Sequence, residues 1–140
     1  MTAGRRGEPE RLPSPRMGIA EETRWLDATD QAGLVARGEA SPLELLDAAI
    51  ERIEAANPAL NAVVIEWFDR ARTAASDLPD GPFRGVPFLL KDLWAHFEGE
   101  LLSNGWQAVK DAAQRSTADT PLVSRSKAAE LAEAGHVQLE

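Results

Sequence analysis

The sequence predicts an α/β fold in which helices come first and short buried strands follow. Apolar residues recur at three- and four-residue spacing in several segments, as they do along helices that bury one face. Short apolar runs follow segments rich in proline and other turn-forming residues, which is typical of buried strands that begin after a turn. A chain of 140 residues, 44% of them hydrophobic and 27% charged, is sufficient for one folded domain.

The composition excludes several classes of function. A net charge of −8 repels the phosphate backbone of nucleic acids, so no nucleic-acid partner is expected. The absence of cysteine excludes disulfides, thiolate metal ligands and cysteine nucleophiles, and it fits a cytoplasmic location. No apolar run approaches the roughly 20 residues of a membrane-spanning helix, so no membrane partner is expected either.

Residues 1–17 are expected to form a disordered tail ahead of a domain at 18–140. The tail is rich in arginine and proline and has no apolar stretch, so it can neither fold alone nor serve as a secretory signal. Met17 is an alternative to Met1 as the first translated residue. In that case the tail would be an artefact of the assumed start.

The first periodic segment predicts a short helix over about 29–37. Asp27 or Thr29 can cap its start, and Gly38 can end it in the left-handed conformation.

A stronger helix signal begins at Ser41. Ser41 and Glu44 form an S-x-x-E capping box, with Pro42 at the first helical position. The apolar face of this helix comprises Leu46, Ala49, Ile50, Ile53 and Ala56. We expect Asn57-Pro58 to end it, because proline cannot continue the hydrogen-bond ladder.

The following segments alternate between strand and helix patterns. The apolar run at 60–65 is compatible with a buried strand, although a buried helical turn has the same signature. Helical spacing resumes over 67–76, and the turn-rich stretch 77–85 leads into an apolar strand at 86–90. A strand, a helix, a turn and a second strand are therefore expected in that order.

Lys91 follows this second strand directly, at the carboxyl end where open α/β sheets build their sites. Burying an ammonium group without a partner is costly and favours the neutral amine, which can act as a general base. The competing interpretation is a lysine whose head reaches water at a strand end, paired with Asp92. From the spacing alone the solvated lysine is the favoured interpretation.

The remaining chain is expected to contain a long irregular connection and one helix. Residues 94–116 show no clear period and include several turn residues. A last helix is expected from a cap at Asp119 or Thr120 to Gly135, which would close it.

Several segments together resemble the N-terminal part of the amidase signature family. They are LDATDQAGLVARGEASPLELLDAAIERIEAANPALNAVV at 26–64, FRGVPFLLKDL at 83–93 and DTPLVSRSKAA at 119–129. Their order is that of the family: a helix ending in Asn-Pro, a Leu-Asn-Ala strand, a G-V-P-F-x-x-K-D strand and a further helix. The resemblance thus covers about residues 26–129.

The resemblance implies a fold and a reaction. The fold is a large mixed β-sheet covered by helices, of which this chain would supply the N-terminal helices and the first strands. The reaction is hydrolysis of the C–N bond of a small amide, without a cofactor, by a Ser-cisSer-Lys triad. Lys91, held neutral by burial, would take a proton through the bridging cis-serine and so activate the nucleophilic serine, while glycine-rich backbone stabilises the oxyanion.

The serine pair of such a triad has no counterpart in these 140 residues. No GGSSGG-like run occurs, and Ser103, Ser116, Ser124 and Ser126 lie before or within the last helix, where the family has neither serine. The segment ELAEAGHVQLE at 130–140 also departs from the family pattern. These features predict a truncated amidase that is inactive alone and whose uncovered sheet edges favour self-association.

Other site hypotheses are weaker. Ser124 and Lys127 match the S-x-x-K spacing of β-lactamases, but the companion motifs are absent. His96 and His136 have no partner at ligand spacing, so no metal site is expected. Trp106 stands where many family members have a small residue, and it would alter the pocket wall if its loop reaches the site.

Two alternatives to a catalytic fragment stay open. The chain could be a non-catalytic interaction module that pairs through the amphipathic helix 41–56, or one half of a split amidase whose remainder is separately encoded. Co-purification distinguishes these ideas. A partner bearing the serine pair indicates a split enzyme, a self-dimer indicates a module, and insoluble aggregate indicates a remnant.

Overall fold

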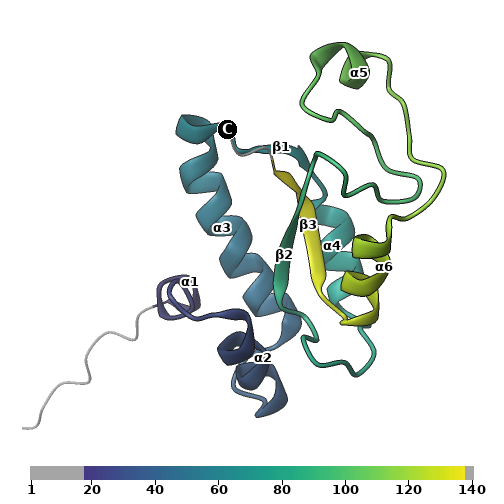
Figure 1. Ribbon diagram of the computed structural model, residues 1–140. Coiled ribbons are helices and arrows are strands. Elements are labelled where there is room, and N and C mark those ends of the chain that lie inside the picture. Colours follow the sequence, from purple (N-terminus) through teal and green to yellow (C-terminus); the bar gives the residue numbers. More distant parts are fainter. Residues whose placement is uncertain (1–17, 138–140) are drawn as a thin grey trace, which may run out of the picture.

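The computed structural model describes residues 18–137 (Figure 1). The expected tail at 1–17, with both candidate start residues, lies outside the described part, as do residues 138–140. In chain order the elements are α1 (Ile19–Glu22), α2 (Ala28–Ala36), α3 (Pro42–Leu60), β1 (Val63–Glu66), α4 (Phe68–Ala75), β2 (Pro87–Lys91), α5 (Gln107–Asp111), α6 (Pro121–Ala128) and β3 (Ala132–Val137). The strands form a mixed sheet in the order β1-β3-β2, with β3 antiparallel to β1 and parallel to β2. The predicted class, α/β with helices covering a mixed sheet, is confirmed.

The helix starts follow their sequence signals. The Asp27 side chain caps α2 by accepting a hydrogen bond of 2.9 Å from the backbone N–H of Asp30. At the start of α3 the backbone N–H of Glu44 donates to the Ser41 hydroxyl, and the Ser41 N–H donates to the Glu44 carboxylate at 2.7 Å. The predicted caps of α2 and α3 are therefore formed, because each depends on residues only three positions apart. The cap predicted for the last helix is not, because Thr120 precedes α6 without a side-chain cap bond and Asp119 accepts from the backbone N–H of Glu98.

The short helix α1 was not predicted. It packs along α3, where the Arg52 guanidinium donates to the carbonyl of Ala20 at 2.7 Å and to the hydroxyl of Thr23 at 3.1 Å. Since these partners lie 32 and 29 residues from Arg52, no local pattern reveals them.

Helix α3 continues past the stop expected at Asn57-Pro58. It ends at Leu60, and Asn61 follows in the left-handed conformation with a φ of 49°. Pro58 lies in the last turn, where its missing N–H removes a single bond near the helix end, so the helix is not broken there. The Asn57 side chain then exchanges hydrogen bonds of 3.0 and 2.9 Å with the backbone of Val63 and leads the chain into β1.

The expected strand, helix and second strand are present with small shifts. β1 begins at Val63, a few residues later than the apolar run at 60–65, and β2 includes Lys91 as its last residue. Gly85 ahead of β2 has a φ of 75°, and a Cβ added there would lie 2.3 Å from the Cβ of Pro42. The turn therefore fits against the start of α3 only because residue 85 is glycine.

The C-terminal end of the described chain corrects the sequence analysis. Helix α6 begins at Pro121 as expected but ends at Ala128 instead of Gly135. Residues 132–137, which had been assigned to the helix and the end of the chain, form the central strand β3. Gly135 lies in this strand, where an added Cβ would be 2.3 Å from the carbonyl oxygen of Ile65. Close packing of β3 against β1 thus explains a glycine that had suggested a helix end.

The connection at 94–116 is also more ordered than predicted. It contains the short helix α5 and isolated bridges that join Glu98 to Ser116 and Leu101 to Arg115. These two bridges hold the two ends of the connection together beyond the carboxyl end of β2.

The two apolar clusters of the core lie on opposite faces of the sheet. One joins α3, α4 and β3, and the other joins α6 and the segment after β2 to the first two strands. Because side chains alternate along a strand, Leu89 packs against the first cluster and Leu90 into the second. Both faces are therefore covered by helices or loops, while β1 and β2 form the two edges within residues 18–137.

Candidate functional site

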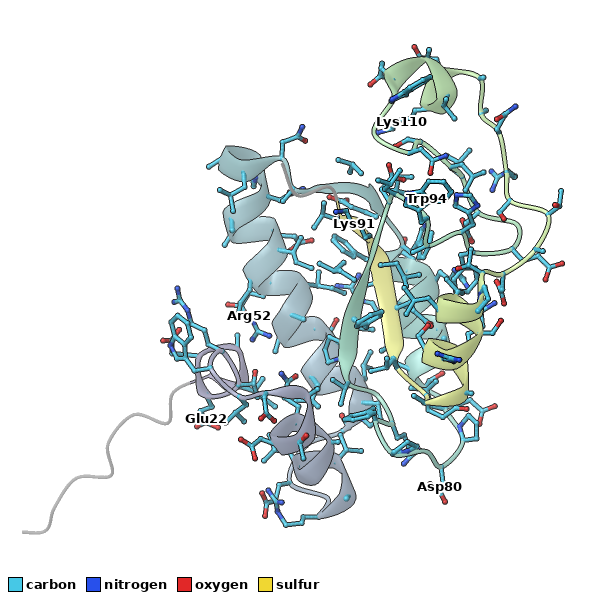
Figure 2. The ribbon with its side chains drawn as sticks, in the orientation of Figure 1. Glu22, Arg52, Asp80, Lys91, Trp94 and Lys110 are labelled. Carbon is cyan, nitrogen blue, oxygen red and sulfur yellow. The ribbon has the colours of Figure 1, made fainter. Side chains whose placement is uncertain are left out.

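Lys91 lies at one end of the sheet (Figure 2). It pairs with Val137 of β3, which in turn pairs with Val63 at the start of β1. Since β2 is an edge strand, its last side chain has a neighbouring strand on one side only, and Lys91 is exposed. Residues 18–137 thus do not supply the burial that a neutral catalytic lysine would need. Within them Lys91 fits the solvated interpretation.

The neighbouring Asp92 is fully buried and anchors the loop that follows β2. One carboxylate oxygen accepts a hydrogen bond of 3.3 Å from the backbone N–H of Ser103. The other accepts from the Ser103 hydroxyl and, at 2.8 Å, from the backbone N–H of Gly105. Asn104 and Gly105 have positive φ values of 49° and 76°, which turn these N–H groups toward the carboxylate. The charge of Asp92 is therefore satisfied by a tight turn.

A cavity of about 580 Å³ opens beside this turn. Its walls come from the α3–β1 connection, from the Ser103–Gly105 turn and from α5 with the residue before it: Leu60, Asn61, Ala62, Val63, Val64, Ser103, Gly105, Trp106, Gln107 and Lys110. The Lys110 ammonium donates a hydrogen bond of 3.0 Å to the carbonyl of Val64, and the Trp106 side chain is 71% exposed. Trp106 is one of the residues that line this cavity, and Figure 2 shows Lys110 and Lys91 toward the same end of the sheet.

A cluster of charges around Phe97 holds the other end of the loop. The Arg70 guanidinium lies 4.0 Å and the Lys127 ammonium 3.7 Å from the centre of the Phe97 ring. Lys127 also pairs with Asp119 at 2.6 Å, and Arg70 with Glu100 at 3.3 Å. Partial burial opposes ionisation of Asp119, but the backbone N–H of Glu98 and the Lys127 ammonium lower its pKa. This cluster joins α4 and α6 to the loop.

Glu133 of β3 lies near the same cations. Burial raises the pKa of its carboxyl group, while a hydrogen bond of 2.9 Å from the Ser126 hydroxyl and the charges of Arg70 and Lys127 act in the opposite direction. Glu133 lies in the sheet because residues 132–137 form β3, the strand that was not predicted from the sequence.

The other sequence-predicted candidates do not form a site. Ser124 is exposed, whereas the Lys127 ammonium is held by Asp119 and the Phe97 ring, so the S-x-x-K match has a structural explanation. The His96 ring nitrogen lies 3.2 Å from the side-chain oxygen of Asn104. The side chain of His136 is outside the described part. Among the described side chains, which do not include that of His136, no group of acidic, histidine or cysteine residues is arranged to hold a metal ion.

Comparison with known proteins identifies the family. The family model for amidase matches residues 44–140. The chain belongs to the amidase family. The match includes the segment 130–140, so the expectation that this segment departs from the family pattern is not supported.

The curated relatives of this amidase-family chain include a hydrolase and an acylamidase by name. It is 45% identical over 105 residues to the 6-aminohexanoate-cyclic-dimer hydrolase of Pseudomonas sp. (strain NK87), covering 75% of this chain and 21% of that protein. It is 40% identical over 85 residues to the acylamidase of Rhodococcus erythropolis, covering 54% of this chain and 17% of that one. The chain thus spans about a fifth of the length of the curated relatives it matches.

Solved structures agree with this assignment. The 6-aminohexanoate cyclic dimer hydrolase complexed with substrate superposes with a TM-score of 0.76 at 40% identity, covering 81% of this chain and 23% of that one. A bacterial aryl acylamidase of the amidase signature family gives a TM-score of 0.75 at 31% identity, with 81% and 25% covered. Within residues 18–137, no helix has the length and apolar character needed to cross a membrane.

The Asp92 anchor and the Lys110 cavity were missed by sequence analysis. Asp92 had been considered only as a partner of Lys91. The signal that could have indicated its role is Asn104-Gly105, because a turn there points neighbouring backbone N–H groups toward one side, where a carboxylate can accept from them. Lys110 has no comparable signal, because its contact with Val64 spans 46 residues.

Proposed function

We propose that this chain supplies Lys91 as the terminal general base of an amidase that hydrolyses the C–N bond of small carboxamides. One observation carries the proposal: Lys91 ends strand β2 in the motif GVPFLLKD, inside the region that matches the amidase family. The bridging cis-serine and the nucleophilic serine would come from residues outside these 140, either as a continuation of the chain or on a separate chain.

In the proposed reaction the neutral amine of Lys91 takes a proton from the bridging serine. That serine takes the proton of the nucleophilic hydroxyl, whose oxygen attacks the amide carbonyl. The proton passes back from Lys91 through the bridging serine to the nitrogen of the leaving amine as the C–N bond breaks. Water then hydrolyses the acyl-serine ester, which releases the acid and restores the nucleophilic hydroxyl. The chemistry requires no metal and no cofactor.

The remainder of the enzyme would serve Lys91 in two ways. It would supply the serines, and it would cover an amine that is exposed within residues 18–137. Removing water from the ammonium group favours its neutral form, which is the form that accepts a proton. An apolar hollow of about 380 Å³ between α3 and β2, lined by side chains such as Ile53 and Phe88, is a further surface for the remainder to cover.

The 140 residues alone are therefore proposed to be inactive. A general base without the nucleophile and the oxyanion donors lacks groups that work only as a unit. Turnover of a chromogenic aryl amide by the purified chain would contradict this part of the proposal.

A chimera tests the role of Lys91 directly. In it, this chain replaces the matched fifth of the 6-aminohexanoate-cyclic-dimer hydrolase, so that the serines are supplied in one polypeptide. We expect amide hydrolysis that Lys91→Met lowers by at least about 1,000-fold, because the triad members act together.

The matched control is Arg125→Met. Arg125 is exposed on α6, and its replacement removes one positive charge without touching the sheet end. The control should retain the activity of the chimera. Activity that survives Lys91→Met, with the control unchanged, would contradict the assignment of Lys91 as the base.

The alternative of a non-catalytic helical module gains no specific support. The first half of the apolar face of α3 is already used, since Leu45, Leu46 and Ile50 are buried within this chain, whereas Ile53 and Ala56 line the apolar hollow between α3 and β2. The large apolar side chains of α3 that are exposed in the described structure are Leu43 and Leu60, at opposite ends of the helix.

A further inference from the structure

The cavity beside the Ser103–Gly105 turn is lined by an ammonium group, that of Lys110, which has unused hydrogen-bond donors. The Lys110 ammonium donates one hydrogen bond, to the carbonyl of Val64, and no carboxylate of residues 18–137 lies within ion-pair distance of it. An ammonium group has three N–H donors, so two can still be given to a ligand. Lys127, by contrast, is neutralised by Asp119 at 2.6 Å.

The rest of the wall matches one kind of ligand. Among the described residues that line the cavity, Lys110 alone carries a charge. The other lining residues are apolar ones of the α3–β1 connection, the polar residues Asn61, Ser103 and Gln107, and Gly105 and Trp106. The chain has a net charge of −8, whereas the charge at this cavity is positive. The cavity therefore favours an anionic ligand whose remaining part is apolar.

The cavity is directly linked to Lys91. Asp92 follows Lys91 in the chain and binds Ser103 and Gly105, which both line the cavity. On the other side, Val63 lines the cavity and lies in the same cross-strand row as Lys91, through Val137. A ligand in the cavity therefore lies at the same end of the sheet as the proposed base, beside β1 and two strands away from Lys91.

We propose that this cavity binds the carboxylate end of an open-chain amide, with Lys110 as the counter-ion and Trp106 as a wall for the carbon chain. The inference rests on the proposed function only for the identity of the reacting bond. It assigns the substrate class, amides that carry a carboxylate on a flexible arm, and it names Lys110 as a residue that determines specificity.

The test compares two ligands of similar length that differ in charge. The purified 140-residue chain is titrated with 6-acetamidohexanoate and with neutral N-hexylacetamide, and binding is followed by calorimetry and by the NMR signal of the Trp106 indole N–H. We expect the carboxylate to bind about five-fold more tightly, as one partly exposed ion pair provides. The preference should weaken as salt is added.

Variants identify the cation responsible. Lys110→Met should abolish the five-fold preference, whereas Lys110→Arg keeps the charge and should retain it. Arg125→Met lowers the positive charge equally at a distant exposed position and should also retain it. Equal binding of both ligands, no saturable binding of the carboxylate, or a preference that survives Lys110→Met would each overturn the inference.

The result of the ligand-binding test of Lys110 can be distinguished from the result of the chimera test of Lys91. A chimera that hydrolyses amides with Lys91 but does not discriminate between the charged and neutral ligands would overturn the role of Lys110 and leave Lys91 as the base. Carboxylate binding that depends on Lys110, together with turnover that does not depend on Lys91, would do the reverse.

Discussion

The hydroxyl and the backbone N–H of Ser103 both donate hydrogen bonds to the carboxylate of Asp92. Asp92 is fully buried and Ser103 nearly so, and they join the end of β2 to the wall of the neighbouring cavity. This pair fixes the turn that carries Trp106 relative to the strand that ends in Lys91. The geometry of the candidate site therefore depends on a buried carboxylate that itself has no assigned chemical role.

Asp92→Asn is expected to destabilise the fold by about 2–4 kcal/mol. The amide cannot accept from all the donors that face the carboxylate, and leaving buried polar groups unpaired carries a cost of this size. Urea unfolding measures the change, and amide exchange should accelerate at Gly105, whose N–H donates to Asp92.

Asp77→Asn is the matched control, because Asp77 is exposed in the turn before β2. It should change the free energy of unfolding by less than about 0.5 kcal/mol. Equal effects of the two substitutions would show that the Asp92 hydrogen bonds do not hold the turn.

Gly85→Ala is expected to destabilise the fold by about 3 kcal/mol or more. The residue has a positive φ, and its new Cβ would overlap the ring of Pro42 at the start of α3. Gly99→Ala separates the two causes, because Gly99 has a φ of 81° with nothing within 4 Å of an added Cβ. That control should cost only the backbone strain, about 1 kcal/mol. Similar unfolding midpoints for the two variants would contradict the close approach to Pro42.

Glu133→Gln should stabilise the fold near neutral pH. Burial raises the pKa of Glu133 in the folded state, so its contribution to stability is present at low pH and is lost as the pH rises through that folded pKa. Glutamine stays neutral and keeps an acceptor for the Ser126 hydroxyl. The variant should therefore exceed the wild type in unfolding free energy at about pH 7, and the difference should shrink toward about pH 4.

Urea titrations at both pH values provide the measurement for Glu133→Gln. Glu51→Gln, at an exposed position of α3, supplies the control for loss of a carboxylate. A stability difference that is constant between the two pH values would rule out burial as the cause.

Ser41→Ala should reduce stability by about 1 kcal/mol, because it removes the acceptor for the backbone N–H of Glu44. Ser124→Ala is the control, since Ser124 is exposed within α6 and has no capping role. Thermal unfolding that shows no difference between these variants would mean that the capping box of α3 is not a source of stability.

The parts of the fold that the sequence predicted are those that depend on neighbouring residues. Caps, the turn before β2 and the helical spacing of α3 and α4 all arise within a few positions, and they were located within a few residues. The end of α3 was misplaced because a proline in the last turn of a helix costs little. In the candidate site, Lys91 drew attention because a lysine after an apolar strand is unusual, and its catalytic role stays a prediction that comes from the family resemblance. Asp92 and Lys110 act through partners distant in the chain, so no local pattern indicated them.

The sequence by itself determined the α/β class, the starts of α2, α3, α4 and α6 and the position of Lys91 at a strand end, because each follows from local propensity or from the alternation of apolar and turn-forming residues. Only the tertiary structure decided that residues 132–137 form the central strand, since alanine and glutamate at these positions also suit a helix and pairing with β1 and β2 selects the strand. It also decided that Lys91 is exposed within residues 18–137, because burial at an edge strand depends on what packs against that edge.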